Sequence, residues 1–110
     1  LVKAWYLGKA KEKFQGLANP WIDRFKIEGV QPETIVLREM PLRWGSCTPI
    51  GKIILNPELI KAPKGCIEYV IIHELCHLIY RDHSSAFFRL QTRYMKDWEK
   101  WKERLERILA

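Results

Sequence analysis

Residues 66–80 constrain the fold of this chain more than any other segment. Apolar side chains cover almost every side of a helix drawn through them, so this helix is predicted to lie at the centre of the domain. The same segment carries His73, Glu74 and His77. Buried groups of this kind must be compensated, because an unpaired buried charge is costly, and a divalent cation supplies that compensation.

Residues 73–77 form an H-E-x-x-H motif. At about 100° per residue, its two histidines lie about 40° apart and one helical turn apart, so both imidazoles can reach one ion. Glu74 lies outside this ligand set but close enough to hold a metal-bound water. A catalytic zinc also needs a third protein ligand and an open fourth position. His83, beyond the expected end of the helix, is the candidate for that third ligand.

The spacing between His77 and His83 matches the metzincin pattern, but that pattern has glycine where this chain has Tyr80. The sequence therefore supports His83 as a ligand and disfavours a true metzincin. Cys76 could bind a soft metal, but it points to a different part of the helix from His77. We interpret Cys76 as a packing residue.

The other patterns predict an α+β domain in which helices pack on a small sheet of about three strands. The predicted segments are a helix over 2–17, a second helix over 20–28, a strand over 34–40, a hairpin of 43–47 and 52–55, a helical turn after Asn56, a helix capped by Ser84 or Ser85, and an amphipathic stretch over 94–108. Asn19-Pro20 is typical of a helix start, which favours two N-terminal helices over the alternative of one kinked helix.

The chain resembles a known family in four stretches: Arg43-Trp44-Gly45-Ser46-Cys47, N-P-E-L-I at 56–60, Y-V-I-I-H-E-L-C-H-L at 69–78, and His83-Ser84 with Phe87-Phe88. They are similar to the motifs of YgjP-like zinc metallopeptidases. More narrowly, the chain resembles the small soluble minigluzincins, which are minimal relatives of membrane-embedded gluzincin peptidases. The resemblance extends over almost the whole chain.

This resemblance implies a zincin-like minimal metallopeptidase, with one catalytic domain over residues 1–110 and the H-E-x-x-H helix under the cleft. Most gluzincins use a glutamate as third ligand, whereas the minigluzincin type uses a histidine, which here corresponds to His83. The chain departs from the pattern at Asp82, where asparagine is expected, and at Phe88, where tryptophan is usual. The role of Asp82 stays open.

The expected mechanism is that of a zinc endopeptidase. Zn²⁺ held by His73, His77 and His83 lowers the pKa of its water toward about 7 and polarises the scissile carbonyl. Glu74 takes the water's proton as general base and passes it to the leaving amine. An extended peptide or protein substrate is expected to add itself as a strand along Arg43, Trp44, Gly45, Ser46 and Cys47. Candidates for stabilising the oxyanion are Tyr80, Tyr94 and Arg43.

Two other functions remain open. A SprT-like protease that acts near DNA would use the same H-E-x-x-H chemistry, and the net charge of +6 is compatible with it. Interspersed charge of this size is more typical of a solvated surface, however, so a nucleic-acid partner is not the primary expectation. A non-catalytic zinc-stabilised interaction domain needs no general base, and Glu74 speaks against it.

The C-terminal segment, about residues 94–110, carries an apolar stripe. Small soluble relatives are thought to be held inactive by their C-terminal segments, so this stripe is a candidate for covering the cleft in its own molecule or, through self-association, in a neighbour. An ordinary packed terminal helix is the alternative. The stripe consists of Tyr94, Trp98, Trp101, Leu105 and Ile108.

Three cysteines without C-x-x-C spacing fit reduced thiols in a reducing compartment better than a disulfide framework. The uncharged apolar stretch 69–72 is far shorter than the roughly 20 residues of a membrane-spanning helix. The first residues do not show the pattern of a signal peptide, although the sequence begins with Leu1 in place of Met, which leaves a missing leader open. The expectation is therefore a cytoplasmic protein without a membrane partner.

Overall fold

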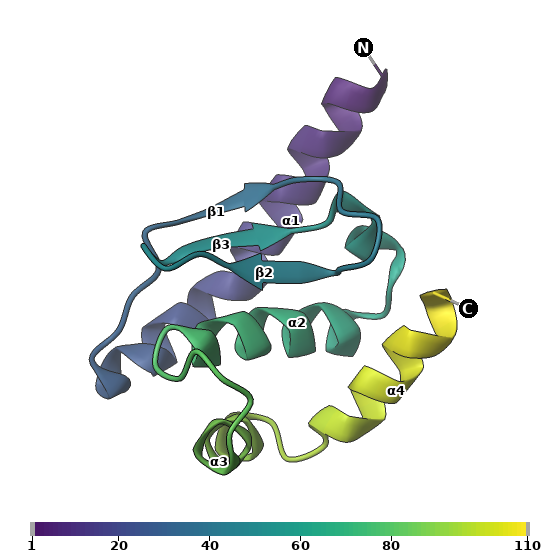
Figure 1. Cartoon of the computed structure of the whole chain (residues 1–110). Helices are drawn as coiled ribbons and strands as arrows, with labels where there is room; N and C mark the ends of the chain where they lie inside the picture. Colours follow the sequence, from purple (N-terminus) through teal and green to yellow (C-terminus); the bar gives the residue numbers. More distant parts are fainter. Residues whose placement is uncertain (1, 110) are drawn as a thin grey trace.

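The computed structural model describes residues 2–109, and the side chains of residues 4–108. Helices α1 and α2 pack against a three-stranded sheet, which confirms the predicted α+β class (Figure 1). The elements are α1 (Val2–Phe25), the 3-10 helix η1 (Lys26–Glu28), β1 (Thr34–Leu37), β2 (Gly45–Cys47), β3 (Lys52–Leu55), the 3-10 helix η2 (Pro57–Lys61), α2 (Lys64–His77), α3 (Ser85–Tyr94) and α4 (Trp98–Leu109).

The sheet has the order β1-β3-β2, so β2 is an edge strand. β2 and β3 form the predicted hairpin and pair antiparallel, whereas β1 pairs parallel with β3. β1 ends at Leu37, earlier than the predicted strand over 34–40. The chain then leaves the sheet, and Pro41 in this stretch has no N–H for a sheet ladder.

Helix α2 lies at the centre of the domain, as its apolar sequence predicted. Figure 1 shows it beside β2, with α1 behind it and with α3 and α4 on the side away from the sheet. Its side chains Ile67, Ile71, Ile72 and Leu75 are fully buried. The helix ends at His77, before the predicted end at 80, and a turn follows that sends the chain back toward the helix.

The prediction of a second helix beginning at Pro20 was wrong, because α1 runs through Pro20 as a single helix. An interior proline costs a helix about 3 kcal/mol through the lost hydrogen bond and the clash of its ring. Phe14 and Phe25 are fully buried on the two sides of Pro20. Burying a phenylalanine contributes about 1.5–3 kcal/mol, so the two anchors offset the cost of the proline.

The predicted C-terminal stretch over 94–108 is divided between two helices. Tyr94 ends α3 and stacks on Phe25, with ring centroids 4.1 Å apart. Trp98 begins α4 and stacks on Tyr69 of α2 at 6.3 Å. Tertiary partners on different elements therefore separate residues that one helical stripe would have placed together.

Helix α4 packs closely on the beginning of α2. A Cβ atom at Gly65 would lie 2.4 Å from Trp101, so only glycine allows this approach. Leu105 is buried, whereas Ile108 stays 46% exposed. Most of the predicted apolar stripe is thus used in packing against α2.

The structure has no helix in its described part that is long and apolar enough to cross a membrane. All three cysteines are free thiols; Cys66 and Cys76 are buried and Cys47 is partly exposed.

Asn56 ties the segment before β2 to the rest of the domain. Its side chain donates to the carbonyl oxygens of Met40 at 2.8 Å and Arg43 at 3.0 Å, and its Oδ1 accepts from the N–H of Glu58 at 3.0 Å. Asn56 is 7% exposed, so these bonds are shielded from water. It caps η2, as predicted, and also holds the strand that borders the site described below.

Replacing Asn56 with Ala should therefore lower the free energy of unfolding by about 2–3 kcal/mol, because three main-chain groups lose their partner. Urea unfolding followed by circular dichroism measures this. The matched control is Asn19→Ala, at an exposed position of α1. For this substitution we expect the free energy of unfolding to change by no more than about 0.5 kcal/mol. Equal effects of the two substitutions would contradict the structural role of Asn56.

Candidate active site

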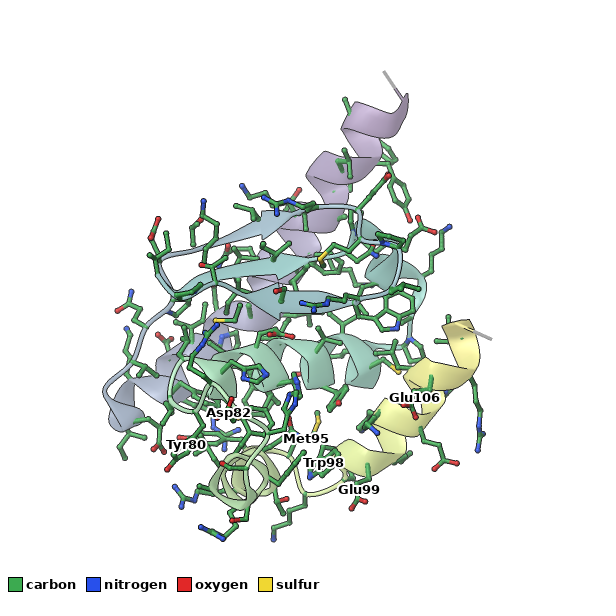
Figure 2. All side chains as sticks on the ribbon, in the orientation of Figure 1. Tyr80, Asp82, Met95, Trp98, Glu99 and Glu106 are labelled. Atoms are coloured by element: carbon green, nitrogen blue, oxygen red, sulfur yellow. The ribbon has the colours of Figure 1, made fainter. Side chains whose placement is uncertain are left out.

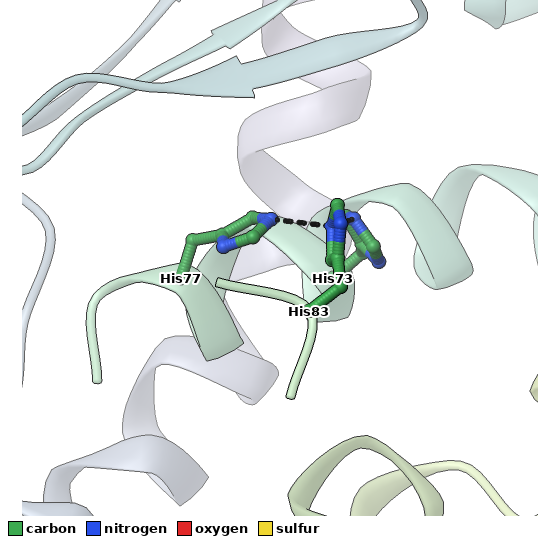
Figure 3. A group of neighbouring side chains, drawn as sticks. All are labelled: His73, His77 and His83. Atoms are coloured by element: carbon green, nitrogen blue, oxygen red, sulfur yellow. Dashed lines mark hydrogen bonds between the residues drawn. The ribbon is translucent and has the colours of Figure 1, made fainter. Parts of the chain in front are cut away.

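Three histidines meet at one point beside the end of α2 (Figure 3). His73 and His77 come from the last two turns of the helix, and His83 comes from the loop between α2 and α3. The Nε2 atom of His83 lies 3.0 Å from Nε2 of His77 and 3.2 Å from Nε2 of His73. The structure thus brings together the three residues that the sequence predicted as metal ligands.

The other ring nitrogens of the two helical histidines are held by hydrogen bonds. Nδ1 of His73 lies 2.8 Å from Oε1 of Gln91, and Nδ1 of His77 lies 3.0 Å from the carbonyl oxygen of Tyr80. Both partners are oxygen acceptors, so each Nδ1 carries the hydrogen and each Nε2 presents a lone pair. A single hydrogen on Nε2 of His83 cannot satisfy both of these lone pairs.

Burial keeps the helical imidazoles neutral. Desolvation lowers the pKa of His73 to about 4, against the opposing effect of its bond to Gln91. The pKa of His77 is lowered for the same main reason. Neutral imidazole is the form that binds metals.

These residues fit a metal ion. Tetrahedral coordination with bonds of about 2.0–2.1 Å places ligand nitrogens roughly 3.3 Å apart, close to the observed 3.0 and 3.2 Å between Nε2 atoms. The donor set of three neutral imidazoles suits zinc and other transition metals.

Phe87 of α3 supports all three histidines. Its ring centroid lies 5.0 Å from that of His73, 4.6 Å from that of His77 and 5.0 Å from that of His83. Ser84 caps α3 by accepting a hydrogen bond from the N–H of Phe87 at 3.3 Å, which confirms the predicted cap. The start of α3 therefore fixes the ring on which the imidazoles pack.

Glu74 is 5% exposed and lies beside the edge strand. A Cβ atom at Gly45 would lie 3.1 Å from Oε2 of Glu74 and 2.7 Å from Val70, so only glycine lets β2 approach α2 this closely. Desolvation raises the pKa of Glu74 to about 8, while the charges of Arg43 and Arg81 act in the opposite direction. Its protonation thus changes close to neutral pH.

An open pocket of about 410 Å³ joins the histidines to the edge strand. It is lined by Arg43, Gly45, Ser46, Cys47, His73, Glu74, His77, Arg81 and His83. Four of the five residues predicted to bind substrate are among them. Trp44 is not; it lines a separate hollow of about 680 Å³ next to Met40 and Pro41.

The remaining predicted positions lie as follows. The hydroxyl group of Tyr94 donates to Oε2 of Glu28 at 2.8 Å, and Tyr94 does not line the pocket, so it is wrong as an oxyanion candidate. Tyr80 contributes its carbonyl oxygen to His77 but does not line the pocket with its side chain. Figure 2 shows Tyr80 and Asp82 on the loop between α2 and α3. Arg43 alone of the three candidates borders the site.

Sequence reasoning missed two residues. Gln91 is fully buried on the apolar face of α3, and a polar residue on that face was the available signal. Arg81 follows the helix end and reaches across to β2, where its Nη2 donates to the carbonyl oxygen of Cys47 at 3.0 Å. No local pattern indicates that contact, because the two residues lie on separate segments.

The described residues of α4 do not line this pocket. Trp98 reaches Phe88 at a centroid distance of 5.5 Å, and Phe88 in turn lies 6.0 Å from His83. Figure 2 shows Met95 and Trp98 where the chain enters α4. Helix α4 therefore contacts Phe88, the aromatic side chain that stacks beside His83. It does not line the pocket onto which the three histidines open.

Comparison with known proteins agrees with this geometry. A family model described as the YgjP-like metallopeptidase domain matches residues 1–108. The crystal structure of the metallopeptidase zymogen abylysin from Pyrococcus abyssi is 27% identical, with a TM-score of 0.67 over 87% of this chain and 91% of that one. The metallopeptidase zymogen jannalysin from Methanocaldococcus jannaschii shares the fold at 16% identity, with a TM-score of 0.73 over 88% of this chain and 97% of that one.

A search of curated proteins finds no match. The match to the family model covers nearly the full length, and it confirms the resemblance to the YgjP-like metallopeptidases. The chain belongs to the YgjP-like metallopeptidase family, and it is a metal-dependent peptidase whose substrates are peptides or proteins.

Proposed function

We propose that this chain is a zinc-dependent endopeptidase in which residues 1–110 form one catalytic domain. The observation that carries the proposal is the convergence of three Nε2 atoms, two of them with lone pairs fixed by outer hydrogen bonds. His73, His77 and His83 would hold the zinc ion, which would supply Lewis-acid polarisation of the scissile carbonyl and a water of lowered pKa. Neutral imidazoles favour zinc over magnesium or calcium.

The role proposed for Gln91 is to hold His73 in one tautomer and one orientation. The carbonyl oxygen of Tyr80 does the same for His77. Outer contacts of this kind orient metal ligands and raise their basicity.

Glu74 is the proposed general base. In its ionised form, Glu74 would take a proton from the attacking water and return it to the leaving amine. Burial alone opposes that form, because desolvation raises the pKa of Glu74 to about 8. A bound cation would lower this pKa and favour the ionised, proton-accepting form. Gly45 supports this role, since its missing side chain leaves Glu74 open to the pocket.

The proposed substrate is an extended peptide segment that pairs with β2. This strand is at the sheet edge and borders the pocket, which is the arrangement needed for strand addition. Arg43 is the residue we assign to the developing oxyanion, because it is the one predicted candidate at the pocket. Trp44 contributes through the neighbouring hollow.

The alternatives have less support. The open pocket and the buried Glu74 speak against a non-catalytic zinc-stabilised domain, because a structural zinc site is usually closed by four protein ligands. A SprT-like action near DNA has only the net charge of +6 in its favour. The free thiols support a reducing, cytoplasmic location.

Latency is a further part of the proposal. Both solved relatives, abylysin and jannalysin, are metallopeptidase zymogens. In this chain, Trp101 packs α4 on Gly65 of α2, and Ile108 lines the hollow beside Trp44. The described residues of α4 do not line the histidine pocket, so we do not propose that they cover it in the same molecule. Blocking by the C-terminal helix of a second molecule, with Ile108 as an exposed apolar contact, is the form we propose.

The metal site predicts a graded loss of affinity. Wild type should bind one zinc ion per chain, Gln91→Ala should weaken binding about 10- to 100-fold, and His83→Ala should weaken it further because a ligand itself is lost. Titration against a fluorescent zinc chelator measures all three. Undiminished affinity in His83→Ala would contradict the three-histidine site.

Glu74→Gln should keep zinc and lose peptide hydrolysis by at least about 100-fold, because the amide cannot accept the proton. Cleavage of a quenched fluorescent peptide library by zinc-loaded protein measures the rate, and metal analysis of the same sample is the control. Hydrolysis at the wild-type rate by Glu74→Gln would remove Glu74 as the base.

Blocking by a second molecule predicts that specific activity rises on dilution as α4-mediated pairs dissociate. Light scattering and peptide cleavage are measured over the same range of protein concentrations, with Ile108→Ser as the variant that weakens the apolar contact. Constant specific activity in a protein that changes from dimer to monomer would contradict this form of latency.

A further inference from the structure

We propose that Arg81 determines substrate specificity by binding a carboxylate of the peptide at one end of the β2 edge. This inference rests on the proposed function, since it requires a peptide that pairs with β2. It concerns a residue outside the ligand set and the general base.

The hydrogen-bond pattern of the hairpin shows which groups of β2 face the open edge. Asn56 donates to the carbonyl oxygen of Trp44, and Thr48 donates to that of Lys52, each at 2.9 Å. In an antiparallel pair, hydrogen-bonded positions alternate with positions whose N–H and C=O point away from the partner. With the observed register, Gly45 and Cys47 are therefore the residues of β2 that face outward.

Arg81 takes one of these outward groups. Its Nη2 donates to the carbonyl oxygen of Cys47 at 3.0 Å, and its Nη1 lies 3.4 Å from that of Thr48 and 3.5 Å from that of His77. A peptide that pairs with the outward groups of Gly45 would therefore meet the guanidinium group of Arg81 at Cys47, the next outward-facing residue of β2. Because Arg81 already occupies the carbonyl oxygen of Cys47, strand pairing with a peptide would stop at this residue.

The charge of Arg81 is available to a ligand. Its contacts are to carbonyl oxygens and, at 3.7 Å, to the thiol of Cys47, all of which are uncharged acceptors. None of the ion pairs found among residues 4–108 includes Arg81. The hydrogen bonds of the Arg81 guanidinium use Nη1 and Nη2, so its Nε–H can join a second Nη2 hydrogen in the fork that fits a carboxylate.

The surroundings favour an anion. Arg43 and Arg81 both line the pocket, and Glu74 is the single acidic side chain in that lining. Because Glu74 is buried, it cannot form a surface pair with Arg81 without leaving its place against β2. The carboxylate can come from an Asp or Glu side chain or from the C-terminus of the peptide.

Binding to the zinc-loaded Glu74→Gln chain tests the inference without turnover. Fluorescence anisotropy is measured with neutral peptides, in which one Glu or one Gln is moved through each position, and each peptide is made with a free and with an amidated C-terminus. We expect one carboxylate position to bind about tenfold tighter than its neutral counterpart. The Glu series and the free-terminus series distinguish the two sources.

Arg81→Gln in this background should abolish the preference, and Arg81→Glu should reverse it toward Lys peptides. The control Arg89→Gln removes an equal charge from exposed α3 outside the pocket and should keep the full preference. Zinc content verifies that each variant is folded at the site. A preference that survives Arg81→Gln and Arg81→Glu, or equal affinity at every position, overturns the inference.

Failure of the proposed function has a different signature. Wild type that cleaves neutral and acidic peptides equally retains the endopeptidase function and loses the role of Arg81. A zinc-loaded chain that neither binds nor cleaves any peptide of the set, at protein concentrations at which light scattering shows monomers, contradicts both.

Discussion

The structure depends on the placement of two imidazoles and a carboxyl group in a helix that is otherwise buried and apolar. Desolvation holds the pKa of His73 near 4 and raises that of Glu74 to about 8. The first shift keeps His73 in the neutral form that binds metal, and a bound cation would oppose the second by favouring ionised Glu74. The helix therefore serves as both hydrophobic core and reactive centre.

Contacts from the neighbouring elements hold these side chains of α2 in position. Gln91 and Phe87 from α3 orient the histidines from one side, and Gly45 lets β2 approach Glu74 from the other. Asn56 holds the segment that leads into that strand. Each contact joins segments far apart in the chain, which explains how a domain of this size supports a site with a buried charge.

The central helix, the hairpin and the pairing of His73 with His77 could be predicted because their signals are local. The H-E-x-x-H spacing directs two rings to one side through helical geometry alone, and the Pro/Gly turn joins two short runs into a hairpin. The predicted break at Pro20 was wrong because burial of Phe14 and Phe25 outweighs a local helix-breaking signal. The C-terminal stripe was divided because Tyr94 and Trp98 find partners on different elements.

The sequence by itself determined the chemistry of the site, because residue type and helical period specify which side chains share a face. It determined the family for the same reason, since the motifs are contiguous. Only the tertiary structure decided that Gln91 holds His73, that Trp44 lies outside the pocket and that Arg81 reaches the edge of β2. Those contacts depend on how separate elements pack, and packing is set by shape and burial across the whole chain, which no local pattern encodes.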